Sequence, residues 1–355
     1  MRGKRNHKRM ENALFLHYLS MIHYFFVTFA ADMKQQPLVS FILTDYNLPT
    51  ELLCEAIDSI LRLSLRSTER EIIIVDDGSD SSPMNSLLKY GDDIIYLRQK
   101  NSGVSVARNT ALAMARGEYI QIIDGDDYLI QAPYEHCLDI IRYNKDADVV
   151  MFDFTHDEGS NDLSYNSPRV KSGTELMRSV NIRGTACCYL FRQSVRGQLT
   201  FTPGIRYGED EEFTPQLLLR AESVSVTDAE AYLYRVRPNS IITDDHVSSK
   251  TKRLNDMEGI ILRLNTMADR MPTDDKTALQ RRVAQLTMDY LYNIIRQTGS
   301  RDYLERKIGE LRSIGLFPLP DRHYTTKYTW FRRLSNSQAG LSLLMRIIPL
   351  MKKER

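Results

Sequence analysis

The chain has almost no excess of charge of either sign, and this absence excludes one broad class of function. It has 47 Lys and Arg against 46 Asp and Glu among 355 residues, a formal net charge of +1. Proteins that bind nucleic acid usually have a basic surface, so we expect no nucleic-acid partner. With 42% hydrophobic and 26% charged residues, the composition is that of a globular protein long enough for two packed units.

Cysteine is also scarce. The four residues are Cys54, Cys137, Cys187 and Cys188. None has the Cys-x-x-Cys spacing of zinc or redox sites, and neighbouring cysteines seldom form a disulfide. This usage favours a reducing compartment, and we expect a cytoplasmic protein.

Acidic residues, by contrast, gather where an apolar run ends. Residues 117–123 have the pattern of a buried strand and lead into Asp124, Asp126 and Asp127. Neighbouring carboxylates repel one another unless a cation joins them, and carboxylate oxygens suit Mg²⁺ or Mn²⁺ together with substrate phosphates. The alternative interpretation is a plain turn, because Asp is a common turn residue.

Two earlier apolar runs also end in polar clusters. Residues 38–44 are followed by Asp45, Tyr46 and Asn47, and residues 71–75 are followed by Asp76 and Asp77. Apolar residues between them have helical spacing, which predicts a strand–helix–strand unit. Ligands of open α/β sheets bind outside the carboxyl ends of such strands.

The same alternation continues to the acidic cluster. A strand is expected at 94–98, a turn and an amphipathic helix at 101–112, and the strand before Asp124 at 118–123. In this order the pieces resemble the family 2 glycosyltransferases, with matching segments from Val39 to about Ser240. The resemblance implies an α/β GT-A fold, the nucleotide-diphospho-sugar transferase fold, with a mixed, mostly parallel sheet between helices.

The resemblance also implies roles for the donor-binding residues. Tyr46 matches the residue that packs against the nucleotide base, and Thr44 lies beside it on the same strand end. Asp77 matches the carboxylate that accepts the base N3–H, which favours uracil because another base leaves a buried acceptor unpaired. Asp76 supports that loop, and Arg108 matches a phosphate or ribose neighbour. The alternatives are a core aromatic for Tyr46, a turn acid for Asp77 and a surface cation for Arg108.

Metal binding and catalysis are implied in the same way. Asp126 corresponds to the carboxylate that holds a divalent metal, Mn²⁺ or Mg²⁺, with Asp124 as its companion. Family members have a Glu-Asp pair before the helix expected at 215–219, and this makes Asp210 the expected catalytic base, which takes a proton from the attacking hydroxyl. The alternative is that the four acids at 209–212 form only a solvated first helical turn.

The expected activity is metal-dependent, inverting transfer of a sugar from a UDP-sugar to a hydroxyl of a glycan or lipid-linked glycan, in surface polysaccharide synthesis. The chain has no Gln-x-x-Arg-Trp segment, and its one Trp is Trp330. Processive synthases of the family have that segment, so we expect a single transfer per encounter. The alternatives are transfer to a polyprenyl phosphate and a nucleotide-sugar binding module without turnover.

The amino terminus gives two conflicting interpretations. Residues 13–31 are apolar and follow a basic stretch, as in a signal peptide or signal anchor, which would export the catalytic unit away from cytosolic donors. Met33 stands just before the first strand, which favours a start codon assigned too early. We therefore separate an N-terminal extension at 1–33 from a catalytic domain at 34–245 and a helical region at 246–355.

The rest of the chain gives coarser expectations. Strands are expected at 146–154, 186–192 and 222–236, a helix at 172–180, and a loop at 155–171. Two cations in 232–240, Arg235 and Arg237, match a family element near the diphosphate, or else belong to a charged edge strand. The apolar, basic carboxyl end at 341–355 predicts either packing on the catalytic unit or contact with the cytoplasmic face of the inner membrane.

Overall fold

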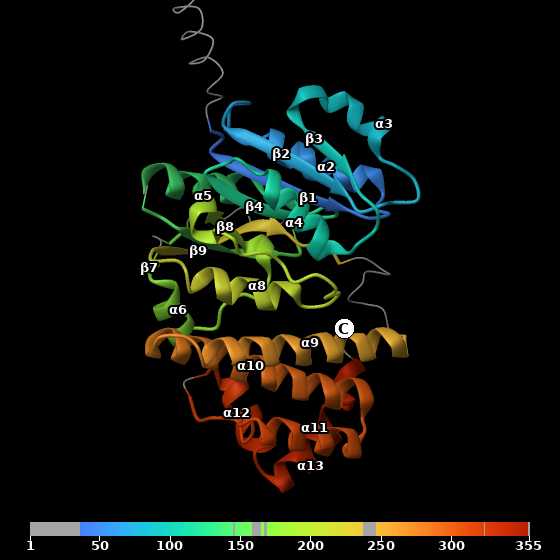
Figure 1. Ribbon diagram of the computed structural model, residues 1–355, viewed down its shortest axis with the longest axis vertical. Helices are drawn as coiled ribbons and strands as arrows, with labels where there is room; N and C mark the ends of the chain where they lie inside the picture. The colour runs from blue at the N-terminus through green and yellow to red at the C-terminus, as the bar shows by residue number, and fades with distance from the viewer. Residues whose placement is uncertain are drawn as a thin grey trace, which may run out of the picture.

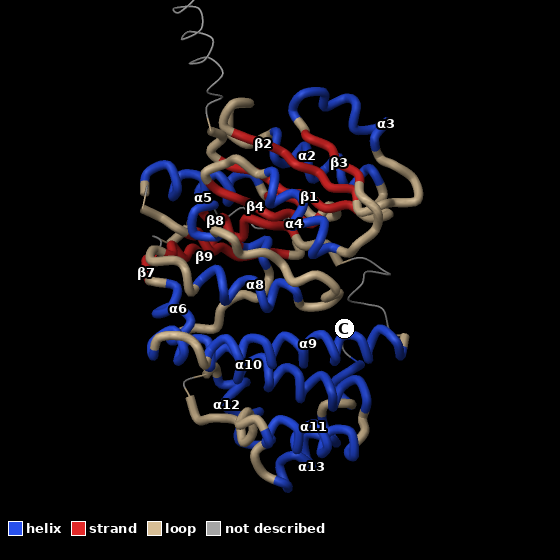
Figure 2. The backbone as a smooth tube through the Cα atoms, in the orientation of Figure 1, coloured by secondary structure: helices blue, strands red, loops and turns tan. Residues whose placement is uncertain are grey.

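The computed structural model describes residues 36–144, 146–157, 165–166, 169–236, 246–322 and 324–353. The amino-terminal segment at 13–31 lies outside these residues, as does Arg237, so the interpretations of both stay predictions. Figure 1 shows a sheet with its covering helices at one end of the molecule and a stack of helices at the other. Figure 2 shows that the strands are confined to the sheet end.

The first half of the sheet is parallel. Its strands are β1 (Val39–Asp45), β2 (Arg70–Asp76), β3 (Ile95–Arg98) and β4 (Tyr119–Asp124), in the spatial order β3-β2-β1-β4. The central residues of β1, β2 and β4 are buried, as expected for strands covered on both faces. All four expected strands are confirmed, and their carboxyl ends lie at one edge of the sheet.

The second half of the sheet is mixed. β8 (Tyr189–Arg192) is antiparallel to β4 and β6 (Val149–Thr155), while β9 (Val224–Leu233) is parallel to β6. Two short strands, β5 (Tyr128–Leu129) and β7 (Arg169–Lys171), pair antiparallel with β9. β7 corrects the expectation of a continuous loop at 155–171. Three residues are too few for a sequence pattern to distinguish a strand from a loop. The pairing with β9 identifies this segment as a strand.

Helices cover the sheet between these strands. The helix expected between the first two strands is α2 (Thr50–Leu61), the one at 101–112 is α4 (Val104–Met114), and the one at 172–180 is α6 (Gly173–Ser179). α5 (Gln131–Tyr143) was not predicted, and its Tyr134 packs between Phe41 and Phe152 in the core. The shorter helical segments are α3 (Met84–Leu87), η1 (Leu88–Asp93), η2 (Ala186–Cys188) and α7 (Gln193–Arg196).

α8 (Glu209–Leu218) begins earlier than the sequence predicts. The apolar residues predict a helix only at 215–219. Here Pro215 lies inside the helix, which starts after Gly208 at φ 82°. The four acids at 209–212 form its first turn, where the positive end of the helix dipole favours them.

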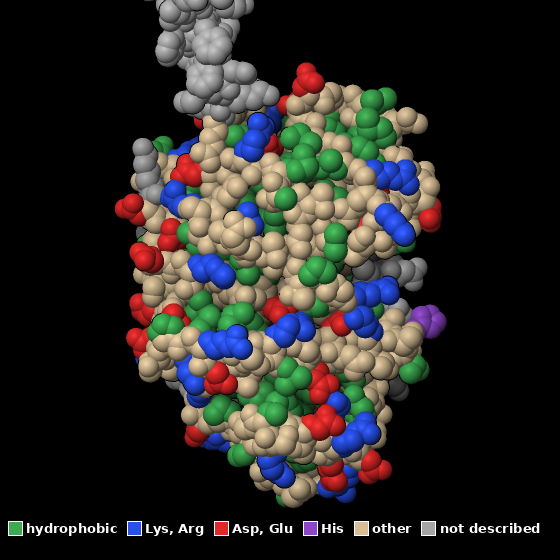
Figure 3. All heavy atoms as spheres, in the orientation of Figure 1, with side chains coloured by type: hydrophobic (Ala, Val, Ile, Leu, Met, Phe, Trp, Pro, Cys, Tyr) green, Lys and Arg blue, Asp and Glu red, His purple; other side chains and the backbone are tan. Residues whose placement is uncertain are grey.

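The carboxyl-terminal part is helical, as expected from residue 248 onward. α9 packs against α8, and α10 packs against α6 as well as α9. Within the described residues, no helix combines the length and apolar character needed to cross a membrane. On the face in Figure 3, acidic and basic side chains are interspersed. The helices are α9 (Val247–Ala268), α10 (Thr273–Thr298), α11 (Arg301–Ser313), α12 (Thr326–Ser335), α13 (Gln338–Ile347) and η3 (Leu350–Lys353).

Candidate active site

The strand ends bring together residues that are far apart in sequence. Thr44 of β1 lies in register with Asp124 of β4, and Asp45 lies in register with Asp76 of β2. Tyr46 follows at once, and its side chain is 50% exposed, which excludes the core alternative for this residue. The expected donor-binding positions therefore share one edge of the sheet.

Asp77 joins two loops at this edge. Its Oδ1 accepts hydrogen bonds from the backbone N of Ser102 at 2.9 Å and from Gln99 Nε2 at 2.7 Å, and its Oδ2 accepts one from the backbone N of Gly103 at 2.8 Å. A carboxylate oxygen has two lone pairs, so Oδ2 retains one after these contacts. The geometry fits the turn-acid interpretation and leaves an acceptor for a nucleobase.

Asp76 has only structural partners among the described residues. It is fully buried and accepts hydrogen bonds from the backbone N of Ser79 at 2.7 Å and from Tyr96 Oη at 2.8 Å. Burial alone raises a carboxyl pKa, but these bonds and the nearby Arg98 cation hold the pKa of Asp76 below its ordinary value. Asp76 therefore supports the loop, as expected.

Arg108 lies at the centre of the acidic cluster. Its side chain is 4% exposed, so the surface alternative is wrong. Nη2 donates to Asp124 Oδ1 at 2.7 Å, while Nη1 donates to Glu209 Oε1 at 2.9 Å and to Asp210 Oδ1 at 2.7 Å. The ring of Phe201 lies 5.2 Å from the guanidinium carbon. One guanidinium thus supplies a cation that joins these carboxylates.

The two acids at the start of α8 are shielded from water. Burial raises the pKa of Asp210, and the Arg108 cation opposes that rise. Burial and the neighbouring Asp210 charge raise the pKa of Glu209 to about 7. The second Asp210 oxygen accepts a hydrogen bond of 3.0 Å from the backbone N of Ala186. A carboxylate held in this way has a raised proton affinity at a fixed position, which suits a general base.

Glu209 is a site residue that the sequence analysis left out. The Glu-Asp pair at a helix start was the available signal. The two acids that follow have other contacts: Glu212 is 4% exposed and binds Arg263, and Glu211 forms an ion pair with Arg282. The interpretation of 209–212 as a solvated turn is therefore wrong.

The loop after β4 is held by Asp127. Its carboxylate accepts hydrogen bonds from Tyr232 Oη at 2.9 Å and from the backbone N of Arg235 at 2.8 Å. Burial and the charges of Asp124 and Asp126 raise the pKa of Asp127 to about 8. Asp127 thus has a structural role, and the neighbouring Asp124 and Asp126 are both partly exposed.

We tested whether these residues fit a divalent metal. In the part of the chain that the structure describes, no three His, Cys, Asp or Glu side chains are grouped as a complete metal site. Asp124 already shares Oδ1 with Arg108. Mg²⁺ commonly binds through one or two carboxylates plus substrate phosphates. The residues present would therefore fit a metal only if a substrate phosphate supplied part of its coordination.

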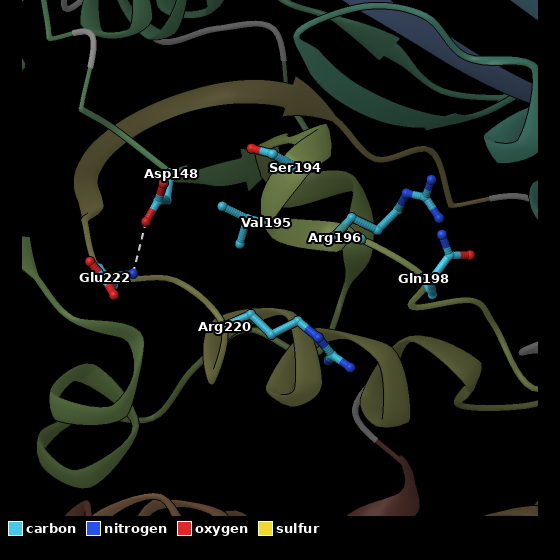
Figure 4. A pocket seen from close by; sticks show the side chains of 8 residues that line it. Asp148, Ser194, Val195, Arg196, Gln198, Arg220 and Glu222 are labelled. Atoms are coloured by element: carbon cyan, nitrogen blue, oxygen red, sulfur yellow. Dashed lines mark hydrogen bonds between the residues drawn. The ribbon is translucent and has the colours of Figure 1, made fainter.

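A separate cavity of about 550 Å³ lies at the opposite edge of the sheet. It includes α7 and Asp148, and β8 pairs there with the beginning of β4 rather than with its acidic end. Figure 4 shows Arg196 and Arg220 extending away from Asp148. The cavity is therefore not part of the acidic cluster.

Comparison with known proteins supports this fold. Residues 40–196 match the sequence model of Glycosyl transferase family 2, and this part of the chain belongs to that family. Among curated relatives, the Uncharacterized glycosyltransferase EpsJ of Bacillus subtilis (strain 168) is 32% identical over 221 residues, 58% of this chain and 63% of EpsJ. The Poly(ribitol-phosphate) beta-N-acetylglucosaminyltransferase TarP of Staphylococcus aureus (strain N315) is 28% identical over 236 residues, 62% of this chain and 67% of TarP. The chain thus spans just under two thirds of EpsJ.

Solved structures confirm the fold over a longer stretch. S. aureus TarS 1-349 in complex with UDP-GlcNAc superposes with a TM-score of 0.60 at 19% identity, covering 89% of this chain and 91% of TarS 1-349. The chain therefore has the GT-A fold expected from the resemblance, including a helical carboxyl-terminal part.

Proposed function

We propose that the chain is an inverting, metal-dependent glycosyltransferase that moves a sugar from a UDP-sugar to a hydroxyl of a glycan. The observation that supports it best is the meeting of Asp124, Glu209 and Asp210 at Arg108, on the edge where the expected donor-binding residues end. A turn acid or a surface helix needs no such convergence. Membership of family 2 supports the same reaction class.

Donor binding is assigned to the loops after β1 and β2. The exposed Tyr46 ring stacks on the base, and the remaining Asp77 lone pair accepts the N3–H of uracil. The backbone N–H groups of residues 102 and 103 already fix the Asp77 carboxylate, so little ordering is needed when the nucleotide binds. The TarS structure contains UDP-GlcNAc, which supports a uridine donor here.

The metal is assigned to Asp126, with Asp124 as its companion. When bound, Mn²⁺ or Mg²⁺ neutralises charge on the departing diphosphate. A mannosyltransferase from Pyrobaculum calidifontis with a similar fold, at a TM-score of 0.51 and 14% identity, was solved with GDP-Man and Mn²⁺. Arg108 keeps the Asp124 carboxylate at the site edge and places a second positive charge near the phosphates.

Asp210 is assigned as the base. A sugar hydroxyl is a weak nucleophile, so a carboxylate within hydrogen-bond reach must take its proton as the bond to the anomeric carbon forms. Ala186 and Arg108 fix the two oxygens of Asp210, and burial raises its proton affinity. Attack opposite to the departing diphosphate inverts the anomeric centre.

The acceptor is assigned to a growing surface glycan, free or lipid-linked. The printed name of TarP describes transfer to poly(ribitol-phosphate), and that of GgaB of Bacillus subtilis (strain 168) describes minor teichoic acid biosynthesis. We extend a role in the synthesis of such a polymer to this chain.

We assign the chain to the cytoplasm, at the cytoplasmic face of the inner membrane. α13 buries Leu341 and Leu344 against its neighbours, but Leu343 and Ile347 are 44% and 43% exposed. No Asp or Glu stands between Asp321 and Glu354. An exposed apolar stripe among basic residues suits an anionic lipid surface. The basic residues of this stretch are Arg322, Lys327, Arg332, Arg333, Arg346, Lys352 and Lys353.

The proposal is tested by incubating the purified chain with UDP-sugars, Mn²⁺ and glycan acceptors and measuring free UDP and the extended product. Product that appears only with both substrates supports the proposal. Binding of the donor without turnover, under every acceptor tried, would instead make the chain a binding module.

A further inference from the structure

The first turn of α8 is held by side chains from α9 and α10. Arg263 of α9 donates to Glu212 through Nε at 2.6 Å and Nη2 at 3.0 Å, the two-point geometry that best fixes a carboxylate. Glu211 forms an ion pair with Arg282 of α10, which is 6% exposed. These two acids directly follow Asp210, so contacts with the carboxyl-terminal helices begin one residue after the proposed base.

α9 also holds the turn that precedes α8. Asp256 Oδ2 accepts hydrogen bonds from the backbone N of Arg206 at 3.0 Å and of Tyr207 at 3.2 Å. A Cβ on Gly208 would lie 3.4 Å from Ile260 Cδ1, so this turn packs directly on α9. The start of α8 is therefore fixed on both sides by α9.

α10 holds the second segment that contacts Asp210. Arg281 Nη2 donates to Asn181 Oδ1 at 2.9 Å, and Gln285 Nε2 donates to the same oxygen. This segment leads to Ala186, whose backbone N donates to Asp210 Oδ2 at 3.0 Å. α10 thus contacts both the helix that contains Asp210 and the segment that orients its carboxylate.

The two segments meet at the carboxylate of Glu211. A Cβ on Gly184 would lie 2.2 Å from Glu211 Oε2, so only a glycine leaves room for the carboxylate there. Arg282 binds that same oxygen. The Arg282–Glu211 ion pair is therefore where α10, α8 and the 181–186 segment contact one another.

We infer that Arg282 is a positioning residue for the transfer reaction, acting through Glu211 to fix the Asp210 carboxylate. The inference rests on the proposed function of Asp210 as the base. Displacement of a catalytic group by about 1 Å can lower a rate about 100-fold. On this account the carboxyl-terminal helices help to position the catalytic base, although Arg282 itself touches no substrate.

The test compares three single variants and one double variant with a matched control. Arg282→Met and Glu211→Gln each remove the ion pair, and Arg282→Lys keeps the charge. We expect kcat to fall about 10-fold to 100-fold in the first two, with the KM for the donor changed by less than about twofold. Arg282→Lys recovers part of the loss. The double variant with both Arg282→Met and Glu211→Gln is no slower than the slower of these two single variants.

The control is Arg178→Met. It removes the ion pair between Arg178 of α6 and Asp274 of α10, whose side chains are 47% and 74% exposed. We expect wild-type kcat from it, since that exposed pair joins α6 to α10 and includes no residue of α8. All rates are measured below the melting temperature of each variant. If Arg282→Met does not fold, Glu211→Gln decides, because its partly exposed side chain keeps its size.

Wild-type kcat in folded Glu211→Gln would overturn the inference, and so would an equal loss in Arg178→Met. Absence of transfer by the wild-type chain would instead overturn the proposed function. A loss of kcat with unchanged donor KM, confined to the Arg282 and Glu211 variants, supports positioning.

Discussion

Arg108 Nη1 lies 2.7 Å from Asp210 Oδ1, so the proposed catalytic base is hydrogen-bonded to a buried cation from α4. The same guanidinium contacts Asp124 at the end of β4. A single side chain therefore links the base to the loop assigned to the metal and diphosphate. This link makes Arg108 both a structural and an electrostatic element of the site.

Removal of Arg108 is expected to destabilise the fold and to abolish transfer. Arg108→Met leaves three carboxylates without their cation in a site where Arg108 itself is 4% exposed. Breaking a buried ion pair in this way costs about 3–5 kcal/mol. Urea unfolding measures the loss, and a UDP-release assay measures activity.

A surface ion pair provides the comparison. Arg66 binds Glu69 at 3.0 Å with its side chain 75% exposed, and Arg66→Met is expected to leave the free energy of unfolding close to the wild-type value. Equal unfolding free energies for the Arg108 and Arg66 variants would contradict the buried-cation account.

Replacing Glu209 should shift the pH dependence of transfer toward acid. The base acts only when ionised, so activity rises with pH as Asp210 loses its proton. Burial raises the pKa of Asp210, and Glu209, whose own pKa is raised to about 7, is coupled to it through their mutual repulsion. Glu209→Gln removes that repulsion, and the Arg108 cation then stabilises the ionised form of Asp210 more strongly. The pKa of Asp210 is therefore expected to fall.

The measurement is kcat/KM between about pH 5 and pH 9 for both proteins, where the acid limb reports ionisation of the free enzyme. We expect the acid limb of Glu209→Gln to move to lower pH. An unchanged limb, or one moved to higher pH, would show that Glu209 does not influence the base.

Metal and donor should stabilise the chain together. If Mn²⁺ binds through Asp126 and the donor diphosphate, UDP with Mn²⁺ raises the melting temperature more than the sum of the two separate effects. Ligand at 100 times its Kd adds about 2.7 kcal/mol to the native state. Asp126→Asn should lose this synergy, whereas Asp139→Asn, on the exposed face of α5, should keep it.

Equal synergy in both variants would remove Asp126 as the metal ligand. Additive effects of UDP and Mn²⁺ on the wild-type chain would argue against a shared metal–diphosphate site altogether. Scanning fluorimetry over a range of Mn²⁺ concentrations distinguishes these outcomes.

Membrane contact is testable without disturbing the core. Deletion of 338–355 would remove the buried Leu341, Leu344 and Ile348, so surface substitutions are preferable. We expect Ile347→Asn with Leu350→Asn to lower co-sedimentation with anionic phosphatidylglycerol vesicles, and added salt to lower it further. Ile314→Asn, 44% exposed after α11, serves as the control. Wild-type binding that is equal for neutral and anionic vesicles, or unaffected by the double substitution, would contradict the proposal.

The sequence predicted much of the sheet because β1, β2 and β4 are buried on both faces. The runs before Asp45, Asp76 and Asp124 are continuous apolar segments, and each ends in a polar turn, which makes their boundaries visible. β7 and α5 lack such signals. β7 has three residues, and α5 has Pro133 in its first turn, where a proline is tolerated but weakens the helical pattern.

The site was predicted in part. Local patterns place acids at strand ends, and electrostatics requires that a cation join them. Spacing alone cannot identify that cation, because Arg108 and Asp210 meet only through tertiary packing. The contacts of Glu211 and Glu212 with α10 and α9 are equally invisible in sequence, where the acidic run has the composition of a solvated turn.

The most direct test of the central claim is the pair of measurements on Asp210→Asn: the rate of sugar transfer and the Kd of the donor by calorimetry. Asn keeps the size of the side chain but places an amide N–H₂ against Arg108 or the Ala186 N–H, so the melting temperature is measured as well. We predict a folded variant with donor Kd near the wild-type value and transfer slower by about 10²-fold to 10⁴-fold. Transfer at the wild-type rate by folded Asp210→Asn would contradict the account.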